Sequence, residues 1–285
     1  MENILEIKNL CKKYNDFELK NINIHLPKGM IMGLIGENGA GKTTTIRAIL
    51  NLIQIHQGEI KILGLDYQEQ ECEIKEDIGI VLDDSFLSEY LNPMDINKIM
   101  KNIYKRWDEK LYFKYIEDFK LPKNKITKEY SSGMKMKLKI AVALSHRPKL
   151  LILDEPTSGL DPVARNEILD LFQDFIQEED HAILVSSHIT SDLEYIADYI
   201  TFIHQGEIVF TKTRDELLEN FGIVKCTKEE FEKIERKDVI KYKKNRYEYE
   251  VLIENKQEFK RKYKIQIIDK PTIEEIMLIY IKGEK

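Results

Sequence analysis

Hydrophobic and polar positions alternate along the first part of the chain. Residues 4–10 (Ile-Leu-Glu-Ile-Lys-Asn-Leu) and 22–26 (Ile-Asn-Ile-His-Leu) follow a period of two, which is typical of strands with one buried face. We interpret residues 4–10 as an edge strand. Residues 30–35 form a short apolar run that suits a fully buried strand, and a glycine-rich segment then leads into a predicted helix over 44–52.

The middle of the chain changes character. Residues from about 84 to 149 are rich in Lys, Tyr and Asp, and their apolar positions have helical spacing. Examples are Ile96, Ile99, Met100 and Ile103. Apolar runs return at 150–153 and 183–186 and predict buried strands. We therefore expect an α/β fold with a parallel sheet, and a helical subdomain inserted between two of its strands.

The last part of the chain is highly charged and mixes helix and strand patterns. Residues 205–210 predict a late hairpin strand, and Thr272 with Glu275 forms a capping box that opens a last helix. We therefore divide the chain into a large domain over 1–213 and a small α+β accessory module over 214–285.

Size and charge narrow the classes of function. The 285 residues suit one large domain with an appendage, and 42% hydrophobic with 33% charged residues describe a soluble globular protein. The net charge of -6 argues against a nucleic-acid partner, which would need a basic face. Three scattered cysteines predict neither disulfides nor a zinc site, and they suit a reducing cytosol. No stretch reaches the roughly 20 apolar residues that span a bilayer, so we expect another chain to supply any span.

Residues 36–44 (Gly-Glu-Asn-Gly-Ala-Gly-Lys-Thr-Thr), the phosphate loop, match the pattern G-x-x-x-x-G-K-[ST] between a predicted strand and a predicted helix. Its glycines let backbone N–H groups point inward, and the start of the helix adds the positive end of its dipole. Lys42 is expected to reach the β- and γ-phosphates, and the Thr43 hydroxyl to ligate Mg²⁺. The alternative is a chance glycine-rich turn. The predicted nucleotide contacts are Gly36, Asn38, Gly39, Ala40, Gly41, Lys42, Thr43 and Thr44.

Two carboxylates end the buried strand over 150–153. Asp154 is placed to hold Mg²⁺ through water, and Glu155 to act as general base on a water that attacks the γ-phosphate. The alternative is that both acids only cap a strand end. Residues 130–134 (Tyr-Ser-Ser-Gly-Met), the signature segment, precede an amphipathic helix for which Ser131 or Ser132 is a good N-cap.

Taken in order, these motifs resemble the nucleotide-binding domain of ABC ATPases, a P-loop NTPase fold, over about residues 1–212. The order is phosphate loop, helical insertion, signature segment, the strand with Asp154 and Glu155, then residues 158–161 (Ser-Gly-Leu-Asp) and 186–188 (Ser-Ser-His). The resemblance implies that two such domains, in a homodimer or a heterodimer, pair head to tail and bind ATP between them.

The resemblance also implies roles for single residues. Ser131 and Gly133 would contact the γ-phosphate bound by the partner domain. Tyr14 would stack on adenine, with an ordinary strand-end tyrosine as the alternative. Asp161 would link the two sites of the dimer. His188 would sense the γ-phosphate and orient the attacking water, and we count it with Lys42 and Glu155 as catalytic.

Three positions depart from the family pattern. Ser132 stands where most members have Gly, and Met134 where most have Gln. Residues 78–83 end in Asp83, where the family usually carries a Gln that ligates Mg²⁺ and links the site to the membrane partner. An aspartate can still be a hard oxygen ligand. We therefore assign Asp83 to the metal, with Asp84 as the neighbour that could substitute.

Three features resemble the ATPases of ABC-2 type systems, which export drugs, peptides or polysaccharides. They are a single nucleotide-binding domain without a fused membrane span, the signature Ser-x-Gly-Met-Lys over 131–135, and the C-terminal module around residues 271–275. By analogy we expect an ATPase, using ATP and Mg²⁺, at the cytoplasmic face of the cell membrane, bound to a separate transmembrane permease subunit. The segment from Asp84 to Leu91 is the expected permease contact, with packing inside the helical insertion as the alternative. A soluble ABC ATPase in translation or DNA maintenance, or an ATP-switched regulatory module, stays open.

Overall fold

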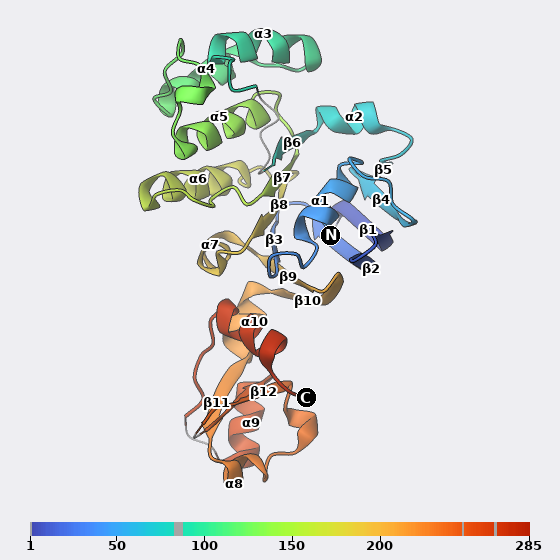
Figure 1. Ribbon diagram of the computed structural model, residues 1–285, viewed down its shortest axis with the longest axis vertical. Coiled ribbons are helices and arrows are strands. Elements are labelled where there is room, and N and C mark those ends of the chain that lie inside the picture. Colours follow the sequence, from blue (N-terminus) through green and yellow to red (C-terminus); the bar gives the residue numbers. More distant parts are fainter. Residues whose placement is uncertain (1, 83–87, 247, 265–266) are drawn as a thin grey trace.

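The computed structural model describes residues 2–82, 88–246, 248–264 and 267–285, and two sheets build its larger part (Figure 1). The first is a four-stranded antiparallel sheet of order β2–β1–β4–β5. Its strands are β1 (Asn3–Lys13), β2 (Glu18–Pro27), β4 (Gln57–Ile62) and β5 (Leu65–Asp66). The expectation that residues 4–10 form an edge strand is wrong, because β1 pairs with both β2 and β4. Alternation reports one buried face and says nothing about how many neighbours a strand has.

The second sheet has six strands in the order β10–β9–β3–β8–β7–β6. They are β3 (Ile31–Ile35), β6 (Ile78–Val81), β7 (Leu150–Asp154), β8 (Ala182–Ser187), β9 (Tyr199–His204) and β10 (Glu207–Thr213). All neighbours are parallel except the β9–β10 hairpin, whose turn residues Gln205 and Gly206 both have positive φ. The parallel pairing that the sequence predicts is confirmed, and the carboxyl ends of β3, β7 and β8 therefore meet at one edge of the sheet.

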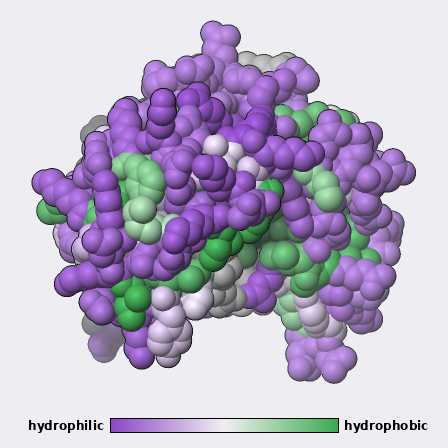
Figure 2. Space-filling view, turned by 90° about the horizontal axis from the view of Figure 1, so that it is seen from above, coloured by the Kyte–Doolittle hydropathy of each residue, from purple (hydrophilic) through white to green (hydrophobic). Residues whose placement is uncertain are grey.

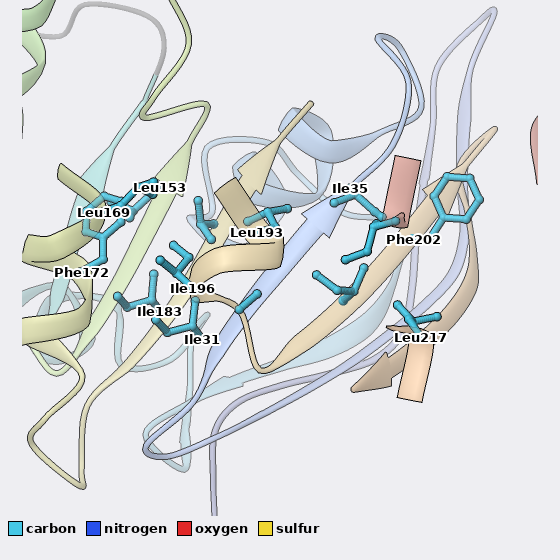
Figure 3. Close-up of a cluster of buried hydrophobic side chains, with 14 of the residues drawn as sticks. Ile31, Ile35, Leu153, Leu169, Phe172, Ile183, Leu193, Ile196, Phe202 and Leu217 are labelled. Atoms are coloured by element: carbon cyan, nitrogen blue, oxygen red, sulfur yellow. The ribbon is translucent and has the colours of Figure 1, made fainter. Parts of the chain in front are cut away.

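Both faces of the six-stranded sheet are buried, which explains the continuous apolar runs of its strands. One face packs against α1 (Lys42–Ile49) and the four-stranded sheet. The other face packs against α5 (Ser132–Leu144), α6 (Pro162–Phe175) and α7 (Thr190–Ile196). Figure 3 shows this second cluster, in which Leu169 and Phe172 of α6 and Leu193 and Ile196 of α7 pack on the strands.

The helices between β6 and β7 form the predicted insertion. They are α3 (Pro93–Ile103), α4 (Glu109–Asp118), the 3-10 turn η1 (Thr127–Glu129) and α5; the short α2 (Glu71–Glu76) precedes β6. The predicted amphipathic helix α5 is instead buried at every position from Leu138 to Leu144. One side of α5 packs against α3 and α4, and the opposite side packs against the sheet.

Residues 214–285, the C-terminal module, contain a three-stranded antiparallel sheet of order β11–β13–β12. The Thr272–Glu275 capping box at its last helix is confirmed. The elements are the π-helical η2 (Glu216–Asn220), β11 (Gly222–Cys226), α8 (Lys228–Phe231), the 3-10 turn η3 (Arg236–Asp238), β12 (Lys241–Lys244), β13 (Tyr249–Ile253), α9 (Lys256–Tyr263) and α10 (Ile273–Lys282).

Each edge of this small sheet carries one backbone bridge to another part of the chain. Ile223 on β11 exchanges two backbone hydrogen bonds with Asp269, at 3.0 and 2.9 Å. Tyr242 on β12 does the same with Glu284, at 3.0 and 2.8 Å. Each edge strand therefore has a backbone partner on its outer side.

The C-terminal module shares its core with the larger domain through α10. Ile276 and Ile279 belong to the same buried cluster as Leu193 and Ile196 of α7. The ring of Tyr280 lies 5.3 Å from that of Phe210, measured between centroids. Glu194 of α7 also accepts a hydrogen bond from the backbone N–H of Ile273, at 2.7 Å. Within the ranges described above, no helix combines the length and the apolar character needed to cross a membrane.

Candidate functional site

The phosphate loop connects the end of β3 to the start of α1, and its geometry requires glycine. A Cβ atom at Gly36 would lie 2.4 Å from the carbonyl oxygen of Ile203. Gly41 has a φ of +118°, which L side chains rarely adopt, and it serves as the N-cap of α1. The loop therefore exposes Glu37, Asn38 and Gly39 while its ends are packed tightly.

Lys42 points back into this loop. Its side chain is buried, at 6% exposure, and its ammonium group donates a hydrogen bond to the carbonyl oxygen of Gly36, at 2.8 Å. The same nitrogen lies 3.6 Å from Oε1 of Glu155. The ammonium group of the loop and the carboxylate at the end of β7 are thus an ion pair in this structure.

Asp154 and Glu155 follow one another at the carboxyl end of β7, where Ser186 of β8 holds both. The hydroxyl of Ser186 donates to Oδ1 of the buried Asp154. It also accepts a hydrogen bond from the backbone N–H of Glu155, at 3.2 Å. The β7–β8 register places Ser186 opposite Asp154. Sequence reasoning missed this role, because the pairing of the two strands is a long-range contact.

His188 completes the group at this edge of the sheet. Its Nδ1 atom lies 2.6 Å from Oε2 of Glu155, and its backbone N–H donates to the same oxygen at 3.2 Å. Lys42, Glu155 and His188 therefore converge from the ends of three neighbouring strands. Glu155 thus contacts both a cation that could anchor a phosphate and an imidazole. A carboxylate held in such a place can act as a general base toward a water beside the phosphate.

Ser131 and Gly133 lie elsewhere in the chain. Ser131 caps α5 by accepting a hydrogen bond from the backbone N–H of Met134, at 3.3 Å, as the sequence predicts. However, α5 packs on the opposite face of the six-stranded sheet from α1. Within one subunit, the signature segment therefore does not lie beside the phosphate loop.

Asp161 lies next to the start of α5. A Cβ atom at Gly133 would lie 3.5 Å from Ala164, in the first turn of α6. Asp161 caps that helix by accepting hydrogen bonds from the backbone N–H groups of Val163 and Ala164, both at 3.0 Å. Its pKa is held below the usual value, chiefly by the Ala164 N–H group. Ser131, Gly133 and Asp161 thus form a second group, separate from the phosphate loop.

Tyr14 lies just after β1, and 43% of its side chain is exposed. The ammonium group of Lys12 lies 5.0 Å from the centre of its ring. The β1–β2 connection runs beside the phosphate loop, since a Cβ atom at Gly41 would lie 3.0 Å from the ring of Phe17. Adenine stacking on Tyr14 stays a prediction.

Two other predictions concern the segment after β6. Asp83 and Asp84 lie outside the described residues, as do residues 85–87, so their assignment stays a prediction. In the rest of that segment, Tyr90 is exposed and Leu91 packs against the helices of the insertion.

Comparison with known proteins gives the family. The model of the family described as ABC transporter matches residues 19–158. The bacitracin transport ATP-binding protein BcrA of Enterococcus faecalis is 37% identical, over 73% of this chain and 69% of that protein. The lantibiotic transport ATP-binding protein SrtF of Streptococcus pyogenes is 35% identical, over 74% of this chain and 92% of that protein.

A solved structure agrees with these relatives. The ATP-binding subunit of an ABC transporter superposes with a TM-score of 0.69 at 28% identity, over 75% of this chain and 91% of the other. It has the same α/β fold as the one described above. At these levels of identity and coverage, the chain belongs to the ATP-binding subunits of ABC transporters and is an ATPase.

Proposed function

We propose that this chain powers a membrane exporter of peptide cargo, as one of two ATP-binding subunits that close on ATP and reopen after hydrolysis. The observation that carries the cargo class is the similarity to two proteins named for bacitracin and lantibiotic transport. Because both names refer to the transport of peptides, we favour peptide cargo over polysaccharides. The direction of transport follows from the resemblance to ABC-2 type systems.

The arrangement of the two groups of site residues supports a dimer. Ser131 lies exposed at the N-terminus of α5, on the far face of the sheet from the phosphate loop. The N-terminus of a helix attracts anions, because its backbone N–H groups and its dipole both favour negative charge. A second subunit, turned head to tail, would bring Ser131 and Gly133 to the phosphates held by Lys42. ATP would then join the two subunits, and loss of the γ-phosphate would loosen them.

The ion pair of Lys42 and Glu155 suggests how nucleotide entry prepares hydrolysis. The β- and γ-phosphates compete with the Glu155 carboxylate for the Lys42 ammonium group. Glu155, freed from this partner, keeps its contact with His188 and accepts a proton from the attacking water. His188 holds the carboxylate and, as the family resemblance implies, would sense the γ-phosphate. Binding would thus convert a neutral pair into a free base.

The residues present fit Mg²⁺ delivered with the nucleotide. In the parts of the chain that the structure describes, no group of three or more His, Cys, Asp or Glu side chains could hold a metal ion. Mg²⁺ usually binds through one or two carboxylates together with substrate phosphates, so such a group is not required. Thr43 and Asp154 would hold the ion, which would neutralise charge on the phosphates.

An apolar groove offers a docking surface for the permease. It has a volume of about 740 Å³ and lies between the sheet and the helical insertion. Hydrophobic atoms gather around a hollow when the molecule is viewed from above (Figure 2). The apolar and aromatic groove residues are Leu50, Leu52, Ile80, Leu82, Met100, Ile103, Tyr104, Val142 and Ala143. Leu82, one of the lining residues, lies two positions before the segment over 84–91 that is expected to contact the membrane partner. We propose that an amphipathic cytoplasmic helix of the permease fills it.

Purification from the native host tests the proposed function. The chain would be tagged, the membranes solubilised in mild detergent, and the co-purifying proteins identified. We expect a polytopic membrane protein at a fixed ratio to this chain. Recovery from the soluble fraction only, with ribosomes, nucleic acid or nothing attached, would contradict the transporter assignment and leave only the ATPase.

A further inference from the structure

Asp192 is a buried carboxylate on α7 that has no part in the site described so far. It is 3% exposed and lies four residues after His188. One of its oxygens, Oδ2, accepts a hydrogen bond from the Thr157 hydroxyl at 2.6 Å. The other, Oδ1, forms an ion pair with Nε of Arg165. Arg165 is held in turn, because its Nη2 donates to the Ser191 hydroxyl at 2.8 Å.

These contacts join three segments of the hydrolysis machinery. Thr157 follows Glu155 by two residues, and Arg165 lies on the first turn of α6, the helix that Asp161 caps. Asp192 belongs to the helix that directly follows His188. The carboxylate of Asp192 therefore lies where the loop over 155–161, the start of α6 and the segment over 188–192 meet.

We infer that Asp192 is a positioning residue for ATP hydrolysis, which holds the loop with Glu155 and Asp161 in register with His188. This inference rests on the proposed roles of Glu155 and His188. The 2.6 Å contact between those two side chains persists only if their loops keep their relative position, since a shift of about 1 Å breaks a hydrogen bond. Asp192, on the helix after His188, fixes that position with directed, charge-assisted bonds to Thr157 and Arg165, which both follow Glu155 in the chain.

The burial of the pair favours this role over simple stabilisation. A buried ion pair is costly to desolvate, and apolar residues of similar size often stabilise a protein as well or better. The burial is explained if the pair holds two loops in one geometry. Misplacement of catalytic groups by about 1 Å lowers rates strongly, so a precise geometry is worth the cost of desolvation. Asp192 itself acts only through Thr157 and Arg165.

The first test uses two substitutions of Thr157, each of which changes a single heavy atom of the side chain. Thr157→Val removes the donating hydroxyl but keeps the shape, and Thr157→Ser keeps the hydroxyl. We expect Thr157→Val to lower kcat at least about tenfold with an ATP dissociation constant within twofold of wild type. Thr157→Ser should keep at least half of kcat. A kcat for Thr157→Val within twofold of that of wild type would overturn the inference.

The second test separates position from stability. Asp192→Asn leaves the Arg165 charge without its partner and should lower both kcat and Tm. The double variant Asp192→Asn/Arg165→Gln removes both charges, so Tm should recover while kcat stays low. If kcat recovers together with Tm, Asp192 has only a structural role and the inference fails. If Asp192→Asn does not fold, the Thr157 pair still decides the question.

Two controls complete the design. Asp180→Asn breaks an exposed ion pair, in which Oδ2 of Asp180 lies 2.8 Å from Nζ of Lys149. These two residues precede β8 and β7, at the end of the strands that lies away from Glu155 and His188, so kcat should not change. Glu155→Gln tests the proposed chemistry itself. If that variant turns over normally, the proposed roles fail; if it is inactive while the Thr157 and Asp192 variants keep their rate, only this inference fails.

Discussion

The ammonium group of Lys42 and the carboxylate of Glu155 face each other across 3.6 Å, at the ends of two strands that are not neighbours in the sheet. The intervening strand, β8, ends in the segment that carries His188. Lys42 and Glu155 thus form an ion pair across the end of β8. We therefore expect substitution of Lys42 to weaken ATP binding and substitution of Glu155 to slow hydrolysis.

Replacement of Glu155 by Gln should preserve ATP binding and slow hydrolysis. The amide keeps the size of the side chain but cannot accept a proton from the attacking water, a contribution of about 10²- to 10⁴-fold in rate. Single-turnover hydrolysis measures the loss, and size-exclusion chromatography with ATP should show an accumulated dimer. Turnover like that of wild type would remove Glu155 from its role.

Replacement of Lys42 by Ala should weaken ATP binding at least roughly tenfold, because a charge-assisted contact with phosphate is lost. Titration with a fluorescent ATP analogue measures the dissociation constant. The matched control is Lys149→Ala, which removes a lysine at the opposite end of the sheet strands. Equal affinities of the Lys42 variant and the control would contradict the assignment of the phosphate loop.

A charge in the groove should release the permease. Ile103 lines the groove and is 58% exposed, so Ile103→Glu should fold and abolish co-purification of the membrane protein. Ile99 lies one turn earlier on α3, is 40% exposed and does not line the groove. Ile99→Glu should therefore retain the partner. Retention by both variants would place the permease contact elsewhere.

The cap at Asp161 predicts a pH-dependent contribution to stability. The folded-state pKa lies below the unfolded value, so this contribution is present above the unfolded pKa and lost as pH falls through the folded one. Asp161→Ala should lower Tm by a few degrees at pH 7, and the difference should shrink below about pH 4. Asp161→Asn keeps a capping oxygen and should lose less. A difference that is constant from pH 7 to pH 3 would exclude the charged cap.

The C-terminal module and the larger domain share a buried core through α10, so the module should contribute to the free energy of unfolding of the whole chain. Ile276 is fully buried between α10 and the larger domain, so Ile276→Ala should cost about 2 to 5 kcal/mol of unfolding free energy. Ile267 is 77% exposed, and Ile267→Ala should change the free energy by less than about 0.5 kcal/mol. Urea denaturation measures both. Two separate transitions, with only one shifted by Ile276→Ala, would show that the module unfolds independently.

Local patterns predicted those features of the fold and of the site whose residues lie close together in sequence. The phosphate loop, the Asp154–Glu155 strand end and the Thr272 capping box each follow from residues within about ten positions. Contacts between distant segments could not be predicted in this way. The pairing of β1 on both sides, the burial of α5 on both sides and the Asp192 contacts depend on which elements meet, and no local periodicity records that.

The bridges at the two edges of the C-terminal sheet limit how this protein can pair with extended segments of its neighbours. An open edge strand offers unpaired N–H and C=O groups to any extended segment, including one from an unfolded copy of the same chain. Here Ile223 on β11 and Tyr242 on β12 each have both backbone groups bonded, to Asp269 and to Glu284 respectively. These two positions therefore have no free backbone group for an added strand. A strand from another copy could pair along either edge only by displacing the bridge or by stopping short of it.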